Sequence, residues 1–251
     1  MNIKRLLPLV FALAVSAFVS PSFAKAPSAQ PNAKSPAPKT EKLLPFMELY
    51  TSQACPRCPK GNENFSNFAA KTDVVAITFP VDYWDFMGWH DTYAQKGFTK
   101  RQEVLNASLG RRGPYTPQVI FNGKEHCSAI NDKTMSRKLE ATSQKQTELS
   151  VAYDGRDLSI ANNATALDIW LIEFEPGETF ATPKSGQNAN KTMVYHNRAK
   201  QISLAGQVSE SGTYHVPCPS HCAIIFEEPD HGAVLGAITF PKTPALNTAL
   251  N

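Results

Sequence analysis

The stretch FMELYTSQACPRCP, residues 46–59, constrains the fold of this chain most, because a short apolar run leads directly into a Cys-x-x-Cys pair. The run Phe46–Tyr50 predicts a strand, and the Cys-x-x-Cys opens a predicted helix. A strand that feeds a helix N-terminus places Cys55 where unpaired backbone N–H groups and the positive end of the helix dipole favour a thiolate. Arg57 and Lys60 add positive charge nearby. We therefore expect Cys55 to be the exposed and more reactive cysteine.

The two cysteines of this motif have distinct expected roles. A thiolate is the attacking species in thiol–disulfide exchange, and a thiol three residues further on can resolve the mixed disulfide. Cys55 is therefore interpreted as the nucleophile and Cys58 as the resolving cysteine, which is expected inside the first helical turn. A structural disulfide and half of a zinc site are the alternatives. Zinc is disfavoured because no second Cys-x-x-Cys or His-x-x-His pair follows at zinc-finger distance.

The N-terminal residues predict an exported protein. Residues 1–24 resemble a secretory signal peptide, with Lys4 and Arg5 before an apolar core and Ser22-Phe23-Ala24 before the expected cleavage site. That core is too short to span a bilayer, and no later stretch approaches about 18 apolar residues, so no membrane span is expected in the mature chain. Residues 25–42 hold four prolines among Ala, Ser and Lys, which predicts a flexible linker. The expected location is periplasmic or secreted.

The charge balance gives no indication of a nucleic-acid partner. The chain has 25 basic residues, and removing Lys4 and Arg5 leaves 25 − 2 = 23 against 22 acidic ones. Nucleic-acid binding needs a clustered basic face, which this sequence lacks.

The remaining three cysteines lie far from the motif. Cys218 and Cys222 are expected to form a structural disulfide, because an exported chain meets oxidising surroundings; Cys127 is left without an assigned partner. His215 and His221 lie beside that pair, so copper or zinc binding is one alternative. A relay disulfide that exchanges with Cys55 is the other.

Residues 43–147 alternate between strand and helix patterns. The nearly continuous apolar run from residue 74 to 79 is typical of a parallel strand buried on both faces. A capping-box pattern begins a helix near residue 100, and Asn122-Gly123 is a hairpin sequence. The expected elements are strands at Val74–Phe79, Gln118–Phe121 and residues 124–128, and helices at residues 100–109 and from Asn131 or Asp132 toward Gln146.

The segment VDYWDFMGWHD, residues 81–91, is dense in aromatic and acidic side chains and has no regular periodicity. It predicts an ordered loop. A packed aromatic cap over the sheet edge is one interpretation, and a substrate-facing surface beside the cysteines is the other. Asp82, Trp84, Trp89 and His90 are the candidate substrate-binding residues, together with Arg57 inside the Cys-x-x-Cys motif.

The order of these elements resembles the thioredoxin fold. That resemblance implies a cis proline opening the third core strand, which matches Thr116-Pro117, and a backbone edge there that is free to pair with an incoming chain. An ordinary trans proline is the alternative. Glu48 lies close to where such proteins keep a carboxylate that relays protons to the resolving cysteine. A shift of one residue would instead point Glu48 to solvent or to an arginine.

A closer resemblance is carried by ELYTSQACPRCP, VDYW-D-x-x-GW-x-D, Arg101-Gln102 and YTPQ-x-x-x-NG, followed by GQNANKT at Gly186–Thr192 and GAVLGA at Gly232–Ala237. Over most of residues 46–250 the chain resembles the exported bacterial proteins classed as domain of unknown function 1223. The family implies a redox motif but no established substrate. One departure is Phe79-Pro80, where the family pattern has a histidine before VDYW.

After residue 148 the pattern changes to short apolar runs separated by polar breaks, which predicts strands. The sequence therefore predicts an α/β thioredoxin-like domain at residues 43–147, followed by a smaller, mainly β, sandwich-like domain at residues 148–251. The segment Glu175–Lys191 is expected to be an exposed loop. The runs are Val151–Tyr153, Leu158–Ile160, Leu167–Phe174, Met193–Tyr195, Tyr214–Val216, Ala223–Phe226 and Val234–Thr239.

These features favour an exported thiol–disulfide oxidoreductase that needs no cofactor or metal. Its expected partners are protein or peptide thiols and disulfides, and a membrane redox partner is a further candidate. A copper-binding metallochaperone and a non-catalytic interaction module are the alternatives, since paired thiolates also select Cu(I). The direction of exchange depends on how far the thiolate is stabilised, which sequence alone does not determine.

Overall fold

The computed structural model describes residues 40–143, 149–161 and 165–241, which belong to one compact unit, Ala37–Asn251. The predicted signal peptide and most of the predicted linker lie outside the described residues. The end of the linker is ordered, since Glu41 N donates a hydrogen bond to Val151 O at 2.7 Å. No described helix is long and apolar enough to cross a membrane.

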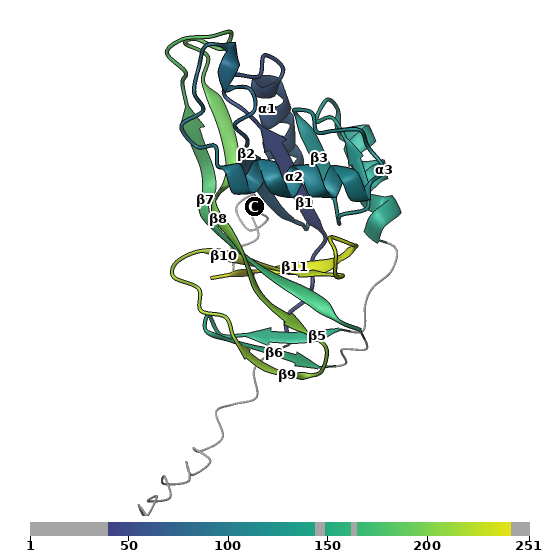
Figure 1. Ribbon diagram of the computed structural model, residues 1–251. Coiled ribbons are helices and arrows are strands. Elements are labelled where there is room, and N and C mark those ends of the chain that lie inside the picture. Colours follow the sequence, from purple (N-terminus) through teal and green to yellow (C-terminus); the bar gives the residue numbers. More distant parts are fainter. Residues whose placement is uncertain (1–39, 144–148, 162–164, 242–251) are drawn as a thin grey trace, which may run out of the picture. The chain divides into compact units, whose positions relative to one another are not determined.

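The main sheet is mixed and has eight strands in the order β11-β10-β7-β8-β2-β1-β3-β4 (Figure 1). β1 pairs parallel with β2 and antiparallel with β3. The strands of this sheet are β1 (Phe46–Thr51), β2 (Val75–Pro80), β3 (Gln118–Phe121), β4 (Glu125–Cys127), β7 (Leu167–Ala181), β8 (Met193–Val208), β10 (Cys222–Glu227) and β11 (Val234–Phe240).

Helices cover both faces of the sheet around β1. The alternation of a strand sends Met47 and Leu49 to one face, where they pack with Phe65 and Phe68 of α1. The intervening residues of β1 face α2 instead, in a separate core cluster. The described helices are α1 (Cys58–Ala69), the 3₁₀ helix η1 (Asp85–Met87), α2 (Lys96–Ser108) and α3 (Asp132–Ser143).

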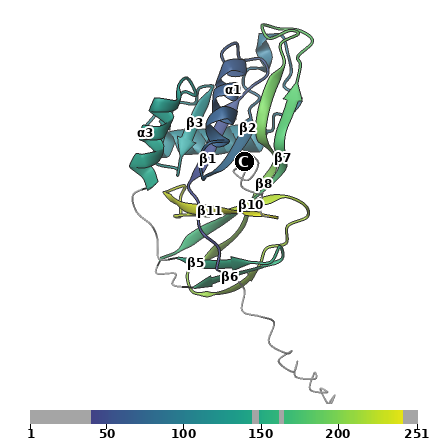
Figure 2. The same cartoon turned by 180° about the vertical axis from the view of Figure 1, so that it is seen from behind.

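The hairpin of β7 and β8 is the longest pairing in the structure. It begins beside β10 and continues past β2 to the N-terminal end of α1, as Figures 1 and 2 show from opposite sides. Thr78 Oγ1 donates to His196 O at 2.7 Å, and Asn197 Nδ2 donates to Ala76 O at 3.1 Å. Through these contacts the later half of the chain joins the sheet begun by the first half.

A second sheet of three strands lies against β10 and β11 in Figure 1, in the order β5-β6-β9. Apolar side chains of β5 and β6 pack with Phe226 and Ile238 of the main sheet in one core cluster. The three strands are β5 (Ser150–Tyr153), β6 (Asp157–Ala161) and β9 (Gly212–His215).

The predicted architecture, an α/β thioredoxin-like domain followed by a smaller sandwich-like β domain, was wrong. The individual elements are present within a few residues, and each apolar run expected after residue 148 is a strand. However, β7, β8, β10 and β11 extend the sheet of β1–β4 instead of forming a domain of their own. The free edge of β2 accepts β8, which satisfies backbone groups that would otherwise stay unpaired.

The predicted loop Glu175–Lys191 also needed correction. β7 continues to Ala181, because its ladder with β8 resumes after a bulge between Glu175 and Glu178. Gly177 adopts a φ of 77° within that bulge, and its N–H donates a hydrogen bond to Asn197 Oδ1 at 2.8 Å. Proline and glycine therefore mark a bulge here and do not end the strand.

A covered disulfide at the start of helix α1

Cys55 and Cys58 form a disulfide at the junction between β1 and α1, with their Cα atoms 5.4 Å apart. Cys58 is the first residue of α1, and Arg57 is its exposed N-cap. The connecting turn is tight, since Cys55 N donates to Ser52 O at 3.2 Å and Cys58 N donates to Cys55 O at 3.1 Å. The pair therefore lies at the positive end of the helix dipole.

Pro117 lies against α1 near this disulfide. The Thr116–Pro117 peptide bond is cis, and a Cβ atom at Gly61 would lie 2.5 Å from Pro117 Cγ. Only glycine allows this close approach between the proline ring and the helix that carries Cys58. Thr116 itself is buried, and its Oγ1 has no hydrogen-bond partner among the described residues.

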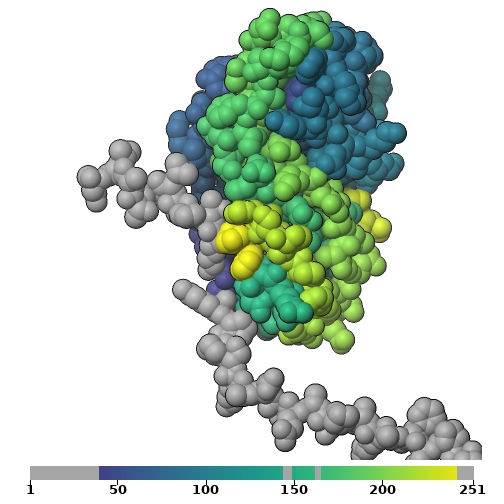
Figure 3. All heavy atoms as spheres, turned by 90° about the vertical axis from the view of Figure 1, so that its left-hand side faces the viewer, coloured from purple at the N-terminus to yellow at the C-terminus, as the bar shows by residue number. Residues whose placement is uncertain are grey.

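Both cysteines are almost fully buried, with exposed fractions of 1% for Cys55 and 0% for Cys58. The expectation of an exposed Cys55 was therefore wrong. Met193 and Tyr195 of β8 pack on the disulfide, and the partly buried Trp84, Tyr93 and Ala181 complete the cluster. Burial arises because β7 and β8 extend far enough to cover the start of α1. In Figure 3 green residues of this hairpin lie beside blue residues that precede and include α2.

The connection between β7 and β8, residues 182–192, is fastened to the cysteine turn by Asn188. Its Nδ2 donates to Gln53 O at 2.9 Å and to Cys55 O at 2.7 Å. Ser185 Oγ adds a hydrogen bond to Gly88 O at 2.7 Å. We call residues 182–192 the strap.

The aromatic loop of residues 81–91 is mainly a packed cap. Trp84 contacts the disulfide cluster and stacks on Phe86, and Trp89 Nε1 donates to Gln53 Oε1 at 2.7 Å. Asp82 and His90 point elsewhere. Asp82 Oδ1 accepts from Thr99 Oγ1 at 2.6 Å, and the exposed His90 pairs with Asp85 at 2.5 Å.

Asp91 is a buried carboxylate that contacts the cysteine turn. Its Oδ2 accepts from Gln53 N at 2.7 Å, and its Oδ1 accepts from Tyr93 N at 2.9 Å. Burial raises the pKa of Asp91 to about 6, although the hydrogen bonds from Gln53 and Tyr93 oppose that shift. Asp91 thus fixes the backbone two residues before Cys55.

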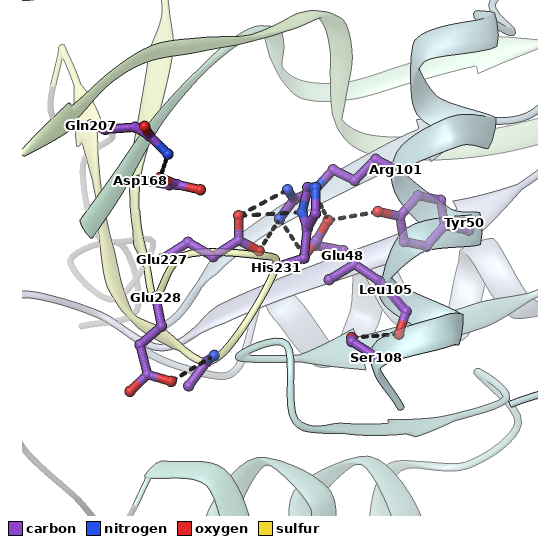
Figure 4. Close-up of polar contacts among 11 residues, drawn as sticks. Glu48, Tyr50, Arg101, Leu105, Ser108, Asp168, Gln207, Glu227, Glu228 and His231 are labelled. Atoms are coloured by element: carbon purple, nitrogen blue, oxygen red, sulfur yellow. Dashed lines mark hydrogen bonds and ion pairs between the residues drawn. The ribbon is translucent and has the colours of Figure 1, made fainter. Parts of the chain in front are cut away.

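Glu48 does not serve the cysteines, so its predicted role as a proton relay is withdrawn. It shares a face of β1 with Tyr50, opposite the face that contacts α1, and both its carboxylate oxygens pair with Arg101 (Figure 4). Tyr50 Oη also donates to Glu48 Oε2 at 2.7 Å. The alternative of an arginine partner was the correct one, and the reason is the two-residue period of the strand.

Cys218 and Cys222 form the second disulfide, with Cα atoms 5.9 Å apart. Among the described residues, no group of three or more His, Cys, Asp and Glu side chains is placed to hold a metal ion. Cys222 pairs in register with Glu173, whereas Ala181, eight positions further along β7 (181 − 173 = 8), packs at the first disulfide. At about 3.3 Å per residue the two disulfides lie roughly 25 Å apart, which rules out direct exchange between them.

Cys127 is the free cysteine of the described chain and is partly buried. Burial raises the pKa of its thiol to about 11, so it stays protonated and unreactive near neutral pH.

Sequence reasoning missed several residues of this site. Asn188 lies in GQNANKT, which carried a family resemblance but no role, and Tyr195 lies in an apolar run assigned only to a strand. Asp91 was the last residue of the aromatic segment. Asn188 and Tyr195 could not be linked to Cys55 from sequence, because their contacts depend on the long-range pairing of β2 with β8. Asp91 reaches the cysteine turn through Gln53 N, 38 positions earlier (91 − 53), a contact that local spacing does not indicate.

Fold and site together define a class of protein: a mixed-sheet protein whose Cys-x-x-Cys disulfide begins a helix and is covered by its own hairpin. The chain belongs to the family described as "Protein of unknown function (DUF1223)", whose sequence profile matches residues 46–234. This confirms the family resemblance.

Two solved structures are similar to this one. Protein AGR_C_4864 from Agrobacterium tumefaciens is 26% identical with a TM-score of 0.66, and the match covers 84% of this chain and 98% of that one. HBP35 of Porphyromonas gingivalis is 12% identical with a TM-score of 0.50, covering 84% of this chain and 78% of that one, so the likeness is one of fold alone. No curated protein matches the chain.

Proposed function

We propose that the protein is an exported thiol–disulfide oxidoreductase that uses Cys55 and Cys58. The observation that carries this proposal is the disulfide at the first turn of α1, in the helix against which Pro117 packs. The helix end and the exposed Arg57 supply the positive potential that stabilises a thiolate once the pair is reduced. The predicted signal peptide at residues 1–24 supports export, to the periplasm or the medium.

The reaction needs no cofactor, because the two sulfurs carry both electrons. In the reducing direction, the Cys55 thiolate attacks a substrate disulfide, an S–S bond forms to Cys55, and one substrate sulfur leaves as a thiolate. The Cys58 thiolate then attacks Cys55 Sγ, which releases the second substrate thiolate and restores the Cys55–Cys58 disulfide. The substrate has gained two electrons and, from solvent and the protein thiols, two protons. Oxidation of a substrate dithiol is the same sequence reversed.

Asp91 is the buried carboxylate that we assign to this site in place of Glu48. It contacts the backbone of Gln53 and not a sulfur, so it is a positioning residue for the cysteine turn. Trp84 and Tyr195 pack on the disulfide and exclude water from it. Asp82 and His90, whose contacts lie away from the cysteines, are left out of the proposed mechanism.

The decisive experiment measures the reduction potential of the pair and its turnover of insulin with dithiothreitol. Wild-type protein should accelerate insulin reduction, Cys55→Ser should abolish the activity, and Cys58→Ser should trap mixed disulfides with substrate proteins. Cys127→Ser is the matched control, because that thiol lies outside the pair. A Cys55–Cys58 disulfide that dithiothreitol does not reduce in the native protein would overturn the proposal.

The burial of both sulfurs supports a second candidate, a non-catalytic interaction module in which this disulfide only stabilises the fold. In that case Cys55→Ser and Cys58→Ser should lower the free energy of unfolding equally. Neither variant should trap a partner, and wild-type protein should leave insulin reduction unchanged.

A further inference from the structure

The strap is an internally organised segment with few attachments to the body of the protein. Its own backbone hydrogen bonds, such as Asn190 N to Pro183 O at 2.8 Å and Ala189 N to Gly186 O at 3.2 Å, fold it into turns. It takes no part in the sheet ladders, which end at Ala181 and resume at Met193. The ladder does not hold the strap itself, but the strap is joined at its two ends to Ala181 and Met193, the last pair of the ladder, and both of these residues pack on the disulfide. Movement of the strap would therefore draw away the end of the hairpin that covers the sulfurs.

Asn188 makes the attachment that matters for the cysteines. It is fully buried, while its neighbour Gln187 is exposed. Both hydrogens of its amide are used on Gln53 O and Cys55 O, on either side of Ala54. As long as these bonds hold, no incoming sulfur can approach the Cys55–Cys58 bond, because the covered pair exposes almost no surface.

With the strap fastened to the cysteine turn, which we call the closed state, some buried polar atoms have no hydrogen-bond partner. Asn188 Oδ1 and Trp84 Nε1 are buried without a hydrogen-bond partner among the described residues, and both residues contact the disulfide or its turn. A buried polar atom without a partner raises the free energy of the state that buries it. Movement of the strap away from the cysteine turn, which we call the open state, would hydrate these atoms. The free energy of the closed state is therefore only modestly lower than that of the open state.

We propose that the strap is a gate, fastened by Asn188, that controls access to the Cys55–Cys58 disulfide. This inference rests on the proposed function and adds its regulation: exchange proceeds only from the open state. Small reductants reach the disulfide only while the strap is open, so the closed state slows its reduction without preventing it. A protein substrate or partner reaches the sulfurs only after the amide of Asn188 has released the two carbonyl groups.

The test compares Asn188→Ala with Gln187→Ala, an exposed neighbour on the same strap. The measured quantity is the rate at which tris(2-carboxyethyl)phosphine reduces Cys55–Cys58 in native protein, followed by alkylation and mass spectrometry of the peptide that contains both cysteines. Asn188→Ala should raise this rate about 30-fold, the factor that corresponds to about 2 kcal/mol for two lost hydrogen bonds. Gln187→Ala should stay within about twofold of wild type.

Ser185→Ala is a second test of the strap, in case Asn188→Ala does not fold. Ser185 is exposed, and its replacement by alanine removes one hydrogen bond, to Gly88 O. It should raise the rate about fivefold, as expected for about 1 kcal/mol. Equal rates for Asn188→Ala, Ser185→Ala and Gln187→Ala would overturn the gate.

The gate and the proposed function fail in different ways. If the variants open the site but neither they nor wild-type protein reduce insulin, the gate stands and the oxidoreductase proposal falls. If insulin is turned over while Asn188→Ala reacts no faster than Gln187→Ala, the function stands and the gate falls.

Discussion

Arg101 and Glu48 form a bidentate ion pair inside the core, with 2.7 Å from Nε to Oε2 and 3.1 Å from Nη2 to Oε1 (Figure 4). A second carboxylate, Glu227 of β10, lies 3.2 Å from Nη1. Burial alone would lower the pKa of Arg101, but the two carboxylates raise it well above its ordinary value. One guanidinium therefore links α2, β1 and β10, elements from both halves of the chain.

We expect Arg101→Met to lower the free energy of unfolding by about 3–5 kcal/mol, because it leaves Glu48 buried without a counter-charge and Glu227 with His231, 3.7 Å from its Oε2, in place of the guanidinium. Lys100→Met is the control: Lys100 is exposed and pairs with Glu103 at 3.8 Å, so its loss should cost less than about 0.5 kcal/mol. Urea unfolding at pH 7 measures both. Similar midpoints for the two variants would contradict the proposed role of Arg101.

The buried Asp91 should make stability depend on pH. Burial raises its pKa from 3.8 to about 6, so the native state holds the proton that the unfolded state has already released. Stability from this group is fully present below about pH 4 and is lost as the pH rises through 6. At about 1.36 kcal/mol per pKa unit the total is about 3 kcal/mol.

The measurement is urea unfolding of wild-type protein and Asp91→Asn from pH 4 to 7.5. The difference in unfolding free energy, wild type minus variant, should fall as the pH rises. Any hydrogen bond lost by the amide shifts this difference by a constant and leaves its slope unchanged. Asp73→Asn, at an exposed carboxylate paired with Lys42, should give a nearly flat difference. A flat profile for Asp91→Asn as well would contradict the raised pKa.

The contrast between Glu48 and Cys55 shows what sequence patterns predicted here and what they did not. The β1 strand and the helix at Cys58 followed from local periodicity, and both are present. The face of β1 on which Glu48 lies depends on a one-residue register. Its ion-pair partner Arg101 lies 53 positions away (101 − 48), and Glu227, which shares Arg101, lies 179 positions away (227 − 48). Local spacing could not identify them.

The burial of Cys55 was missed for a related reason. Its cover comes from Met193 and Tyr195, more than a hundred residues later, through a strand that continues past Gly177. A glycine in a bulge and a glycine in a loop have the same sequence signature, so Glu175–Lys191 was expected to be exposed. The length of the β7–β8 hairpin was therefore the property that sequence left open, and that length decides access to the site.

The close contact between Gly61 and Pro117 predicts an unusual response to alanine. Alanine in a helix interior is normally more stable than glycine by about 0.5–1 kcal/mol. Gly97→Ala, in the first turn of α2, should be neutral or gain up to that amount, because nothing lies within 4 Å of its new Cβ. Gly61→Ala should instead destabilise the protein by about 1–3 kcal/mol, since its Cβ would overlap Pro117. Thermal or urea unfolding compares the two. If both variants gain stability, Pro117 does not pack on α1 as described.

The second disulfide should stabilise the fold without taking part in exchange. Cys218 and Cys222 close a short loop, and the loop-entropy relation gives about 2 kcal/mol for a link of this length. The double variant Cys218→Ala/Cys222→Ala should therefore unfold at lower urea concentration by that amount. Its rate of insulin reduction and the reduction potential of the Cys55–Cys58 pair should match wild type, because roughly 25 Å separates the two disulfides.

Loss of insulin turnover in a variant that is still folded would show that the second pair passes electrons to the first through a movement absent from the closed state. The assignment of Cys218 and Cys222 as purely structural would then be wrong.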